Sequence, residues 1–137
     1  MSILDWETSL DIRPSSPAWR ATLSAMYGLP LDDEGRDLYR RLSGRDEPPQ
    51  RTDELFVVAG RRGGKSETIA RVAVYEALHG GHEIALAPGQ VGLIVVISPL
   101  REQSKEILNY ARGLAQHPDV AHAVSNVTRD AVEFANG

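Results

Sequence analysis

The first third of the chain has apolar positions at helical spacing. Ser16-Pro17 has the residue types of an N-cap and a first helical turn. Apolar side chains follow at i, i+4 and i+7, namely Trp19, Leu23 and Met26. Gly28-Leu29-Pro30 is typical of a helix end. This stretch therefore predicts an amphipathic helix between Ser16 and Gly28.

A second short helix is predicted to begin at Asp32 or Asp33 and to end at Gly44. Its apolar side consists of Leu38, Tyr39 and Leu42. The stretch from Arg45 to Asp53 is mostly polar and contains Pro48-Pro49, which predicts a linker or long loop. We expect residues 1–53 to form a helical lead-in and linker, and residues 54–137 to form a different kind of structure.

Two short apolar runs mark the second region. Leu55–Val58 and Leu93–Ile97 are rich in branched side chains and predict strands that are buried on both faces. A helical pattern follows each run, over residues 65–78 before Gly80-Gly81 and from Ser98-Pro99 to His117-Pro118. The order strand, helix, strand, helix predicts parallel strands joined by a right-handed crossover. The expected fold class is therefore α/β, with a partial parallel sheet and flanking helices.

The last residues predict one more strand. Ala131–Phe134 alternates in polarity and runs into Asn136-Gly137, the strongest short hairpin-turn signal. No returning strand follows this turn in the sequence. We interpret the chain as one that is cut inside a larger fold, and a frayed polar end is the alternative interpretation.

Composition narrows the classes of protein. The chain has 137 residues, a formal net charge of −4 and no cysteine, which excludes disulfides, thiolate metal sites and cysteine catalysis. Residues 1–54 carry that whole net charge. The longest apolar run, Val91–Ile97, is far shorter than the ~20 residues of a membrane helix, and Met1–Asp11 lacks a signal-peptide layout. The absence of cysteine fits a reducing compartment, and we expect no membrane partner.

A phosphate-binding motif lies between the first predicted strand and its helix. The pattern G-x-x-x-x-G-K-[ST] is matched at Gly64-Lys65-Ser66, whereas Ala59 occupies the place of the first glycine. A strand-to-helix turn directs backbone N–H groups and the positive helix end toward one point. A glycine-rich turn with exposed basic residues is the structural alternative.

The residues of this loop suggest distinct roles. Gly63 and Gly64 would let the backbone curl around phosphate groups. Lys65 would reach the β- and γ-phosphates, and the Ser66 hydroxyl would bind Mg²⁺. Arg61 or Arg62 would stabilise charge on the γ-phosphate, with surface solubility as the alternative role, more so for Arg62.

At these residues the sequence resembles the large terminase subunit of tailed phages, the ATPase and nuclease that drives DNA into the capsid. The loop Gly60-Arg61-Arg62-Gly63-Gly64-Lys65-Ser66 is similar to that family's variant Walker A motif. The stretches Ala73-Val74-Tyr75, Ile97-Ser98-Pro99 with Gln103, and Phe134–Gly137 are similar too, as are Tyr27–Leu31 and Arg41–Arg45 in the lead-in. The similarity spans most of this chain but only the first part of the family's ATPase domain.

The resemblance implies a P-loop NTPase-like fold, with ATP and Mg²⁺ as cofactors. Arg61 then corresponds to the family's cis-acting arginine, Lys65 to its catalytic lysine and Ser66 to its magnesium-binding hydroxyl. The implied nucleotide-binding set is Gly60, Arg61, Arg62, Gly63, Gly64, Lys65, Ser66 and Glu67. For the full-length motor, the implied partners are double-stranded DNA, the portal and the small terminase subunit, in the bacterial host cytoplasm.

The sequence also departs from the family. No apolar strand followed by Asp and a catalytic Glu is found, and the nuclease's acidic metal ligands are absent. We therefore expect weak nucleotide binding and no useful hydrolysis by this chain alone, because nothing would orient and deprotonate the attacking water. The alternatives are a fragment of a helicase-like P-loop ATPase and a non-enzymatic module that binds a nucleotide or a partner.

Other candidate residues suggest structural roles. The histidine pairs 79/82 and 117/122 do not have metal-ligand spacing with a carboxylate, so surface or capping roles are expected. Trp19 and Tyr39 are predicted to be core anchors rather than adenine contacts, and Gln50 is a further adenine candidate.

Overall fold

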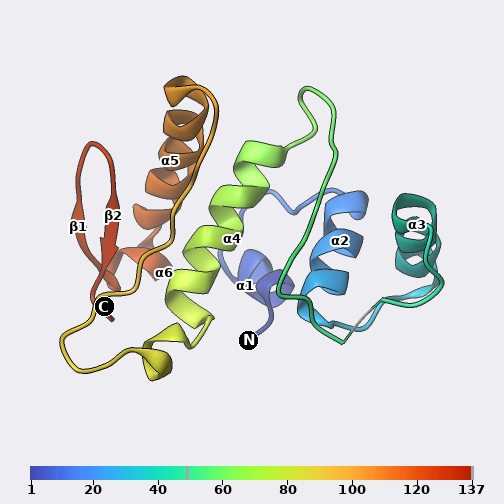
Figure 1. Ribbon diagram of the computed structural model, residues 1–137, viewed down its shortest axis with the longest axis horizontal. Helices are drawn as coiled ribbons and strands as arrows, with labels where there is room; N and C mark the ends of the chain where they lie inside the picture. Colours follow the sequence, from blue (N-terminus) through green and yellow to red (C-terminus); the bar gives the residue numbers. More distant parts are fainter. Residues whose placement is uncertain (49, 137) are drawn as a thin grey trace. The chain divides into compact units, whose positions relative to one another are not determined.

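The computed structural model describes residues 1–48 and 50–136 (Figure 1). The chain divides into two compact units, Met1–Arg61 and Arg62–Gly137. Each unit is described by itself below. Of the predicted features, Pro49 of the linker and Gly137 of the hairpin turn lie outside the described residues.

The N-terminal unit is helical. It contains α1 (Ile3–Ser9), α2 (Pro17–Tyr27) and α3 (Asp33–Ser43). The two helices predicted from the sequence are confirmed as α2 and α3, with Ser16 and Asp32 as N-caps. The core of this unit is made of apolar side chains from all three helices and their ends, chiefly Ile3, Trp6, Leu10, Ala21, Leu23 and Tyr39. Tyr39 is therefore a core residue, as predicted, and Trp19 is half-buried.

Helix α1 was not predicted from the sequence, although its signals are present. Ser2 caps the helix and forms a capping box with Asp5, in which each side chain bonds the other's backbone N–H. The Ser2 bonds lower the pKa of the Asp5 carboxyl, because they favour its ionised form. The buried Glu7 accepts hydrogen bonds from the hydroxyl and the backbone N–H of Ser15, at 2.7 and 3.3 Å. This contact joins α1 to the segment before α2.

Both α2 and α3 end on a glycine in the left-handed conformation. Gly28 has φ 66° and ψ 30°, and Gly44 has φ 70° and ψ 13°. The segment after α3 returns past the end of α2, where the Thr52 N–H donates to the Met26 carbonyl at 3.0 Å. The Gln50 carbonyl lies against Gly28 so closely that a Cβ there would come within 1.2 Å of its oxygen. Gly28 is therefore required for both its conformation and its lack of a side chain.

The C-terminal unit is built on two long helices, α4 (Lys65–His79) and α5 (Arg101–Ala115), which pack against each other. Both were predicted. A single 3₁₀ turn, η1 (His82–Ala85), follows α4, and the short α6 (Pro118–Ala121) follows α5. The buried apolar side chains of the two long helices are Ala70, Val74 and Tyr75 from α4, and Ile107, Ala111 and Ala115 from α5.

A small antiparallel hairpin completes this unit. Strands β1 (Val124–Val127) and β2 (Val132–Phe134) pair with each other, and an irregularity in register falls between Val124 and Asn126. The strand predicted near residues 131–134 is confirmed as β2, but its partner precedes it in the chain and was not predicted. The Asn136 side-chain amide donates to the Ala77 carbonyl at 2.8 Å, which ties the end of the hairpin to α4.

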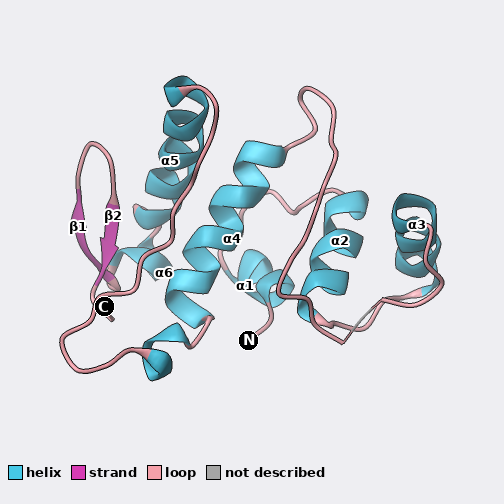
Figure 2. Cartoon of the chain, viewed as in Figure 1, coloured by secondary structure: helices cyan, strands magenta, loops and turns pink. Residues whose placement is uncertain are grey.

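The predicted fold class is wrong. Among the described residues, the structure has six α-helices and a single two-stranded antiparallel sheet, and it contains no parallel sheet of the P-loop NTPase kind. Leu55–Val58 and Leu93–Ile97, the two predicted buried strands, are loops in Figure 2. Their side chains are largely exposed, with Phe56 at 91% and Leu93 at 83%.

The physical reason is that an apolar, branched run creates only a local preference for extended backbone. A strand also needs a neighbour whose backbone satisfies its N–H and C=O groups. Within the described parts of the chain, neither run has such a neighbour. Helical periodicity, in contrast, was sufficient to predict α2, α3, α4 and α5. A helix satisfies its backbone hydrogen bonds within itself, so it needs no neighbouring segment.

None of the described helices has both the length and the apolar character that crossing a membrane requires.

Candidate phosphate-binding site

The start of α4 has the local geometry of an anion-binding turn. Gly64 is the N-cap of α4 with φ 75° and ψ 12°, and no side chain caps the helix there. The first intrahelical bond runs from the Thr68 N–H to the Gly64 carbonyl, at 3.0 Å. Lys65 and Ser66 are the first two residues of the helix. Backbone N–H groups and the positive end of the helix dipole thus lie beside the lysine and serine of the motif.

Arg62 contributes a second left-handed residue to this turn, with φ 61°. A non-glycine residue in this region is uncommon and costs roughly 1–2 kcal/mol, because its Cβ approaches the following carbonyl. Turns that contain left-handed residues direct neighbouring N–H groups into a shared concavity, the arrangement called a nest. Nothing in the sequence pattern predicted this conformation at an arginine.

The strain at Arg62 gives a stability prediction. We expect Arg62→Gly to raise the free energy of unfolding by up to about 1 kcal/mol, since glycine relieves the strain but orders more backbone on folding. The control is Arg61→Gly, where φ is not positive, and a loss of about 0.5–1 kcal/mol is expected there. Urea unfolding followed by far-UV circular dichroism measures both. Equal losses in the two variants would contradict a left-handed Arg62.

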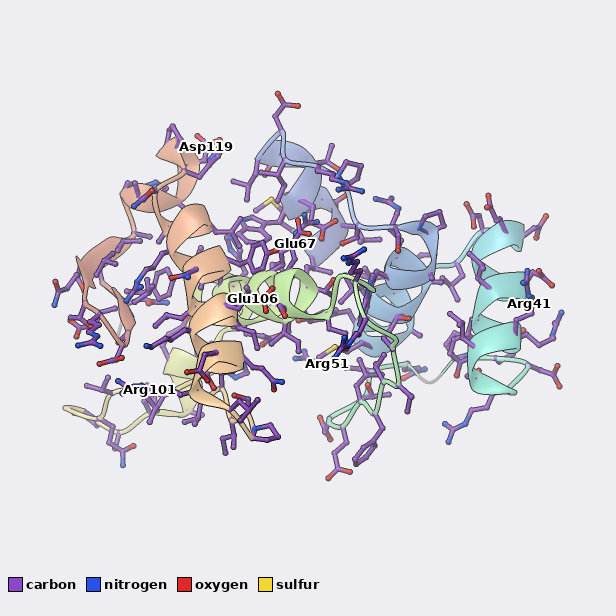
Figure 3. All side chains as sticks on the ribbon, turned by 90° about the horizontal axis from the view of Figure 1, so that it is seen from above. Arg41, Arg51, Glu67, Arg101, Glu106 and Asp119 are labelled. Atoms are coloured by element: carbon purple, nitrogen blue, oxygen red, sulfur yellow. The ribbon has the colours of Figure 1, made fainter. Side chains whose placement is uncertain are left out.

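The charges of this region are arranged unevenly. Arg61, Arg62, Gly63 and Gly64 are exposed, and Lys65, Ser66 and Glu67 are half-buried. The Glu67 carboxylate, labelled on α4 in Figure 3, forms an ion pair with Arg71 one turn later. Arg71 is only 4% exposed. This pair was not predicted, although the i, i+4 spacing of Glu67 and Arg71 is a signal for it.

The helix behind the turn is held firmly. Ala70, Val74 and Tyr75 are buried, and α4 packs along α5 over much of its length (Figure 1). The N-terminal turn of α4 therefore projects from a packed scaffold. A rigid scaffold keeps backbone donors in place without further ordering when a ligand binds.

The predicted loop crosses the division between the two units. Gly60 and Arg61 end the N-terminal unit, and Arg62 begins the C-terminal unit. The structure thus brings together Arg62, Gly63, Gly64, Lys65, Ser66 and Glu67 as one local group around the start of α4. The roles assigned to Gly60 and Arg61 stay predictions.

The described residues also limit how a metal would be held. Among them, no three His, Cys, Asp or Glu side chains are placed to hold a metal ion. The Ser66 hydroxyl, at the second position of α4, is a side-chain group here that could bind Mg²⁺ beside a phosphate group. A metal in this position would neutralise charge on the β- and γ-phosphates.

The adenine candidates do not line the cleft found in the N-terminal unit. A cleft of about 340 Å³ lies within the N-terminal unit, and its lining includes Leu4 of α1, Pro17 and Arg20 of α2, Leu38 of α3, and Leu31 between α2 and α3. Trp19, Tyr39 and Gln50 do not line it, and neither does any residue of the phosphate-binding motif. The adenine contacts considered for these three residues stay predictions.

The histidines make local contacts. His82 Nε2 lies 2.5 Å from Glu76 Oε2, and the His79 ring packs against Tyr75 with ring centroids 5.4 Å apart. Desolvation lowers the pKa of the His79 imidazole, because its charged form loses hydration. His117 caps α6 through a contact with the Asp119 N–H at 3.3 Å. These contacts are structural.

Comparison with protein-family models, with curated proteins and with solved structures gives no significant match for this chain. The assignment of a function therefore depends on the site itself.

Proposed function

We propose that this chain binds the phosphate groups of Mg²⁺-ATP at the turn Gly60–Ser66 that leads into α4. The observation that supports this most directly is the position of Gly64, a left-handed N-cap followed at once by Lys65 and Ser66 at the start of a 15-residue helix. This arrangement combines backbone N–H groups of the first helical turn, a helix dipole and a cation, which together favour a polyanion. The proposal needs only this local geometry and no parallel sheet.

Each residue of the turn then has a proposed role in binding the nucleotide. Lys65 would interact with the β- and γ-phosphates, and Arg62, with Arg61 before it, would add positive charge toward the γ-phosphate. Ser66 would bind Mg²⁺ through its hydroxyl. Glu67 would act indirectly, because its ion pair with Arg71 fixes the first turn of α4. The sequence has no group in a Walker B position to activate water, so the activity expected of this chain alone is binding without turnover.

The larger role we propose is that of the ATP-binding part of a phage terminase large subunit, supported by the resemblance of residues 60–66 and the helix after them. In that role the complete motor would act on double-stranded DNA with the portal and the small subunit, in the cytoplasm of the bacterial host.

The helical architecture favours a second candidate. Without a parallel sheet among its described residues, the chain fits a non-enzymatic module that uses the same turn to bind a nucleotide or other phosphate compound. Binding of phosphate without turnover is expected of both candidates, and a cooperative thermal unfolding transition of the chain alone would favour the non-enzymatic module.

Isothermal titration with a series of nucleotides tests the proposal. We expect Mg²⁺-ATP to bind more tightly than Mg²⁺-ADP, and AMP and adenosine to show no binding, because the recognised group is the phosphate chain. Equal affinity for ATP and adenosine would place recognition on the base and refute the phosphate site. Steady-state phosphate release above background would contradict the expectation of binding without turnover.

A further inference from the structure

Glu67 occupies the third position of α4, where a carboxylate commonly interacts with the start of its own helix. The positive end of the helix dipole and the N–H groups of the first turn attract an anion there. The same chain shows this in α1, whose third residue is Asp5. The Asp5 carboxylate accepts a hydrogen bond from the backbone N–H of Ser2, the N-cap, at 3.3 Å. A carboxylate at the third position is therefore a competitor for an external anion.

In α4 the carboxylate is directed the other way along the helix. Glu67 forms an ion pair and a hydrogen bond with the guanidinium of Arg71, one turn further toward the C-terminal end. Gly64, the N-cap of α4, has no side-chain capping bond among the described residues. The start of α4 thus lacks the internal carboxylate cap that α1 has.

Burial makes Arg71 a strong partner for this carboxylate. Arg71 is buried, whereas Glu67 is half-buried. A buried guanidinium is held tightly to a carboxylate, because a buried charge without its partner is costly. An acidic residue four positions before a basic one is also the favourable order on a helix. The position of Arg71 on the packed side of α4 therefore determines where the charge of Glu67 lies.

We infer that Arg71 is a positioning residue that keeps the Glu67 carboxylate away from bound phosphate groups, a role that rests on the phosphate site proposed above. Arg71 is buried one turn beyond the motif, so it acts through Glu67 and not by touching the nucleotide. Without Arg71, the same carboxylate would turn toward the N–H groups at the start of α4. There it would compete with a phosphate group for those donors and repel it.

Arg71→Met tests this role, because methionine fills much of the space of arginine without its charge. The substitution leaves no buried charge unpaired, since Glu67 is half-buried. We expect it to weaken binding of Mg²⁺-ATP by roughly 10-fold, as one uncompensated negative charge beside a partly exposed anion site would. Isothermal titration is the measurement.

A second variant distinguishes this role from simple support of the helix. Arg71→Met combined with Glu67→Ala removes the competing carboxylate as well, and it should bind Mg²⁺-ATP within about 2-fold of the wild-type chain. If Arg71 only supported the packing of α4, removal of Glu67 would not restore the affinity, because the lost packing would still be missing.

Arg112→Met is the matched control for loss of an arginine. Arg112 lies on α5 in the same unit, and its guanidinium donates to the carbonyl of Thr128 rather than to an acidic residue. The substitution removes the same charge from the unit and should leave the affinity for Mg²⁺-ATP unchanged. Far-UV circular dichroism checks that each variant keeps its helices.

Backbone amide NMR without nucleotide reports the position of Glu67 directly. In Arg71→Met the amide signals of Gly64 and Lys65 should shift, because the freed carboxylate approaches the start of α4. In the double variant these signals should return toward their wild-type positions. Unchanged signals in Arg71→Met would refute the inference, whatever the affinity for ATP.

Two titration results would also overturn it. Equal affinity of the wild-type chain and Arg71→Met would show that Arg71 does not protect the site. A loss that persists in the double variant would make Arg71 a structural residue only. A wild-type chain that binds no Mg²⁺-ATP would instead refute the proposed function, and the amide signals would then decide whether Arg71 positions Glu67.

Discussion

Replacing Lys65 with alanine is expected to abolish detectable binding of Mg²⁺-ATP. The ammonium group at the first position of α4 would make charge-assisted hydrogen bonds to phosphate oxygens, and one such bond contributes about 1.5–3 kcal/mol, a loss of roughly 10- to 100-fold in affinity. For a site that binds weakly, that loss takes the complex out of the measurable range. Isothermal titration of the two proteins under the same conditions is the measurement.

The chain supplies a matched control for this substitution. Lys105, on α5, is the second of its two lysines, and it is exposed. Lys105→Ala removes the same charge from the same unit and should leave the affinity for ATP unchanged. Alanine is a strong helix former, so neither variant should lose helix in far-UV circular dichroism. Identical titrations of the wild-type chain and Lys65→Ala would show that the turn is not the phosphate site.

Gly28→Ala is expected to destabilise the N-terminal unit by several kcal/mol. Two costs add at this position. A left-handed residue with a side chain costs roughly 1–2 kcal/mol, and the new Cβ would lie 1.2 Å from the Gln50 carbonyl oxygen, so the returning segment must move. Moving it would break the hydrogen bond from Thr52 to Met26.

Gly44→Ala separates the two costs. Gly44 has nearly the same conformation at the end of α3, but a Cβ there meets nothing within 4 Å. Only the conformational cost of about 1–2 kcal/mol is expected there. Trp6 and Trp19, the two tryptophans of the chain, both lie in the N-terminal unit, so urea unfolding followed by tryptophan fluorescence reports that unit. Equal losses in the two variants would mean that the segment at Gln50 does not contact Gly28.

The helices could be predicted from sequence because their signals are local. Ser16-Pro17 and Gly28 bound α2, and Asp32 and Gly44 bound α3, close to where the patterns place them. The start of α4 was predicted at about Lys65, and the structure has it there. Where a predicted cap was misplaced, the helix still formed: α5 begins after Leu100, and Ser98 instead donates to the Leu100 carbonyl at 2.7 Å.

The site was predicted in part for the same reason. A glycine pair before Lys65-Ser66 is a local signal for a turn into a helix, and the structure has that turn. The left-handed backbone at Arg62 has no such signal, because arginine rarely adopts it. The burial of Arg71 beside Glu67 depends on how α4 packs in the tertiary structure.

The sequence by itself determined α2 and α3 with their caps, the helical stretches of α4 and α5, and the residue types gathered at the start of α4. Helical hydrogen bonds join residues four apart, so near neighbours carry the information. The tertiary structure decided the strands. Val124–Val127, with its polar positions, became β1 because β2 lies beside it, whereas the more apolar Leu93–Ile97 remained a loop without a partner among the described residues. Strand formation depends on distant backbone groups that periodicity along the chain does not identify.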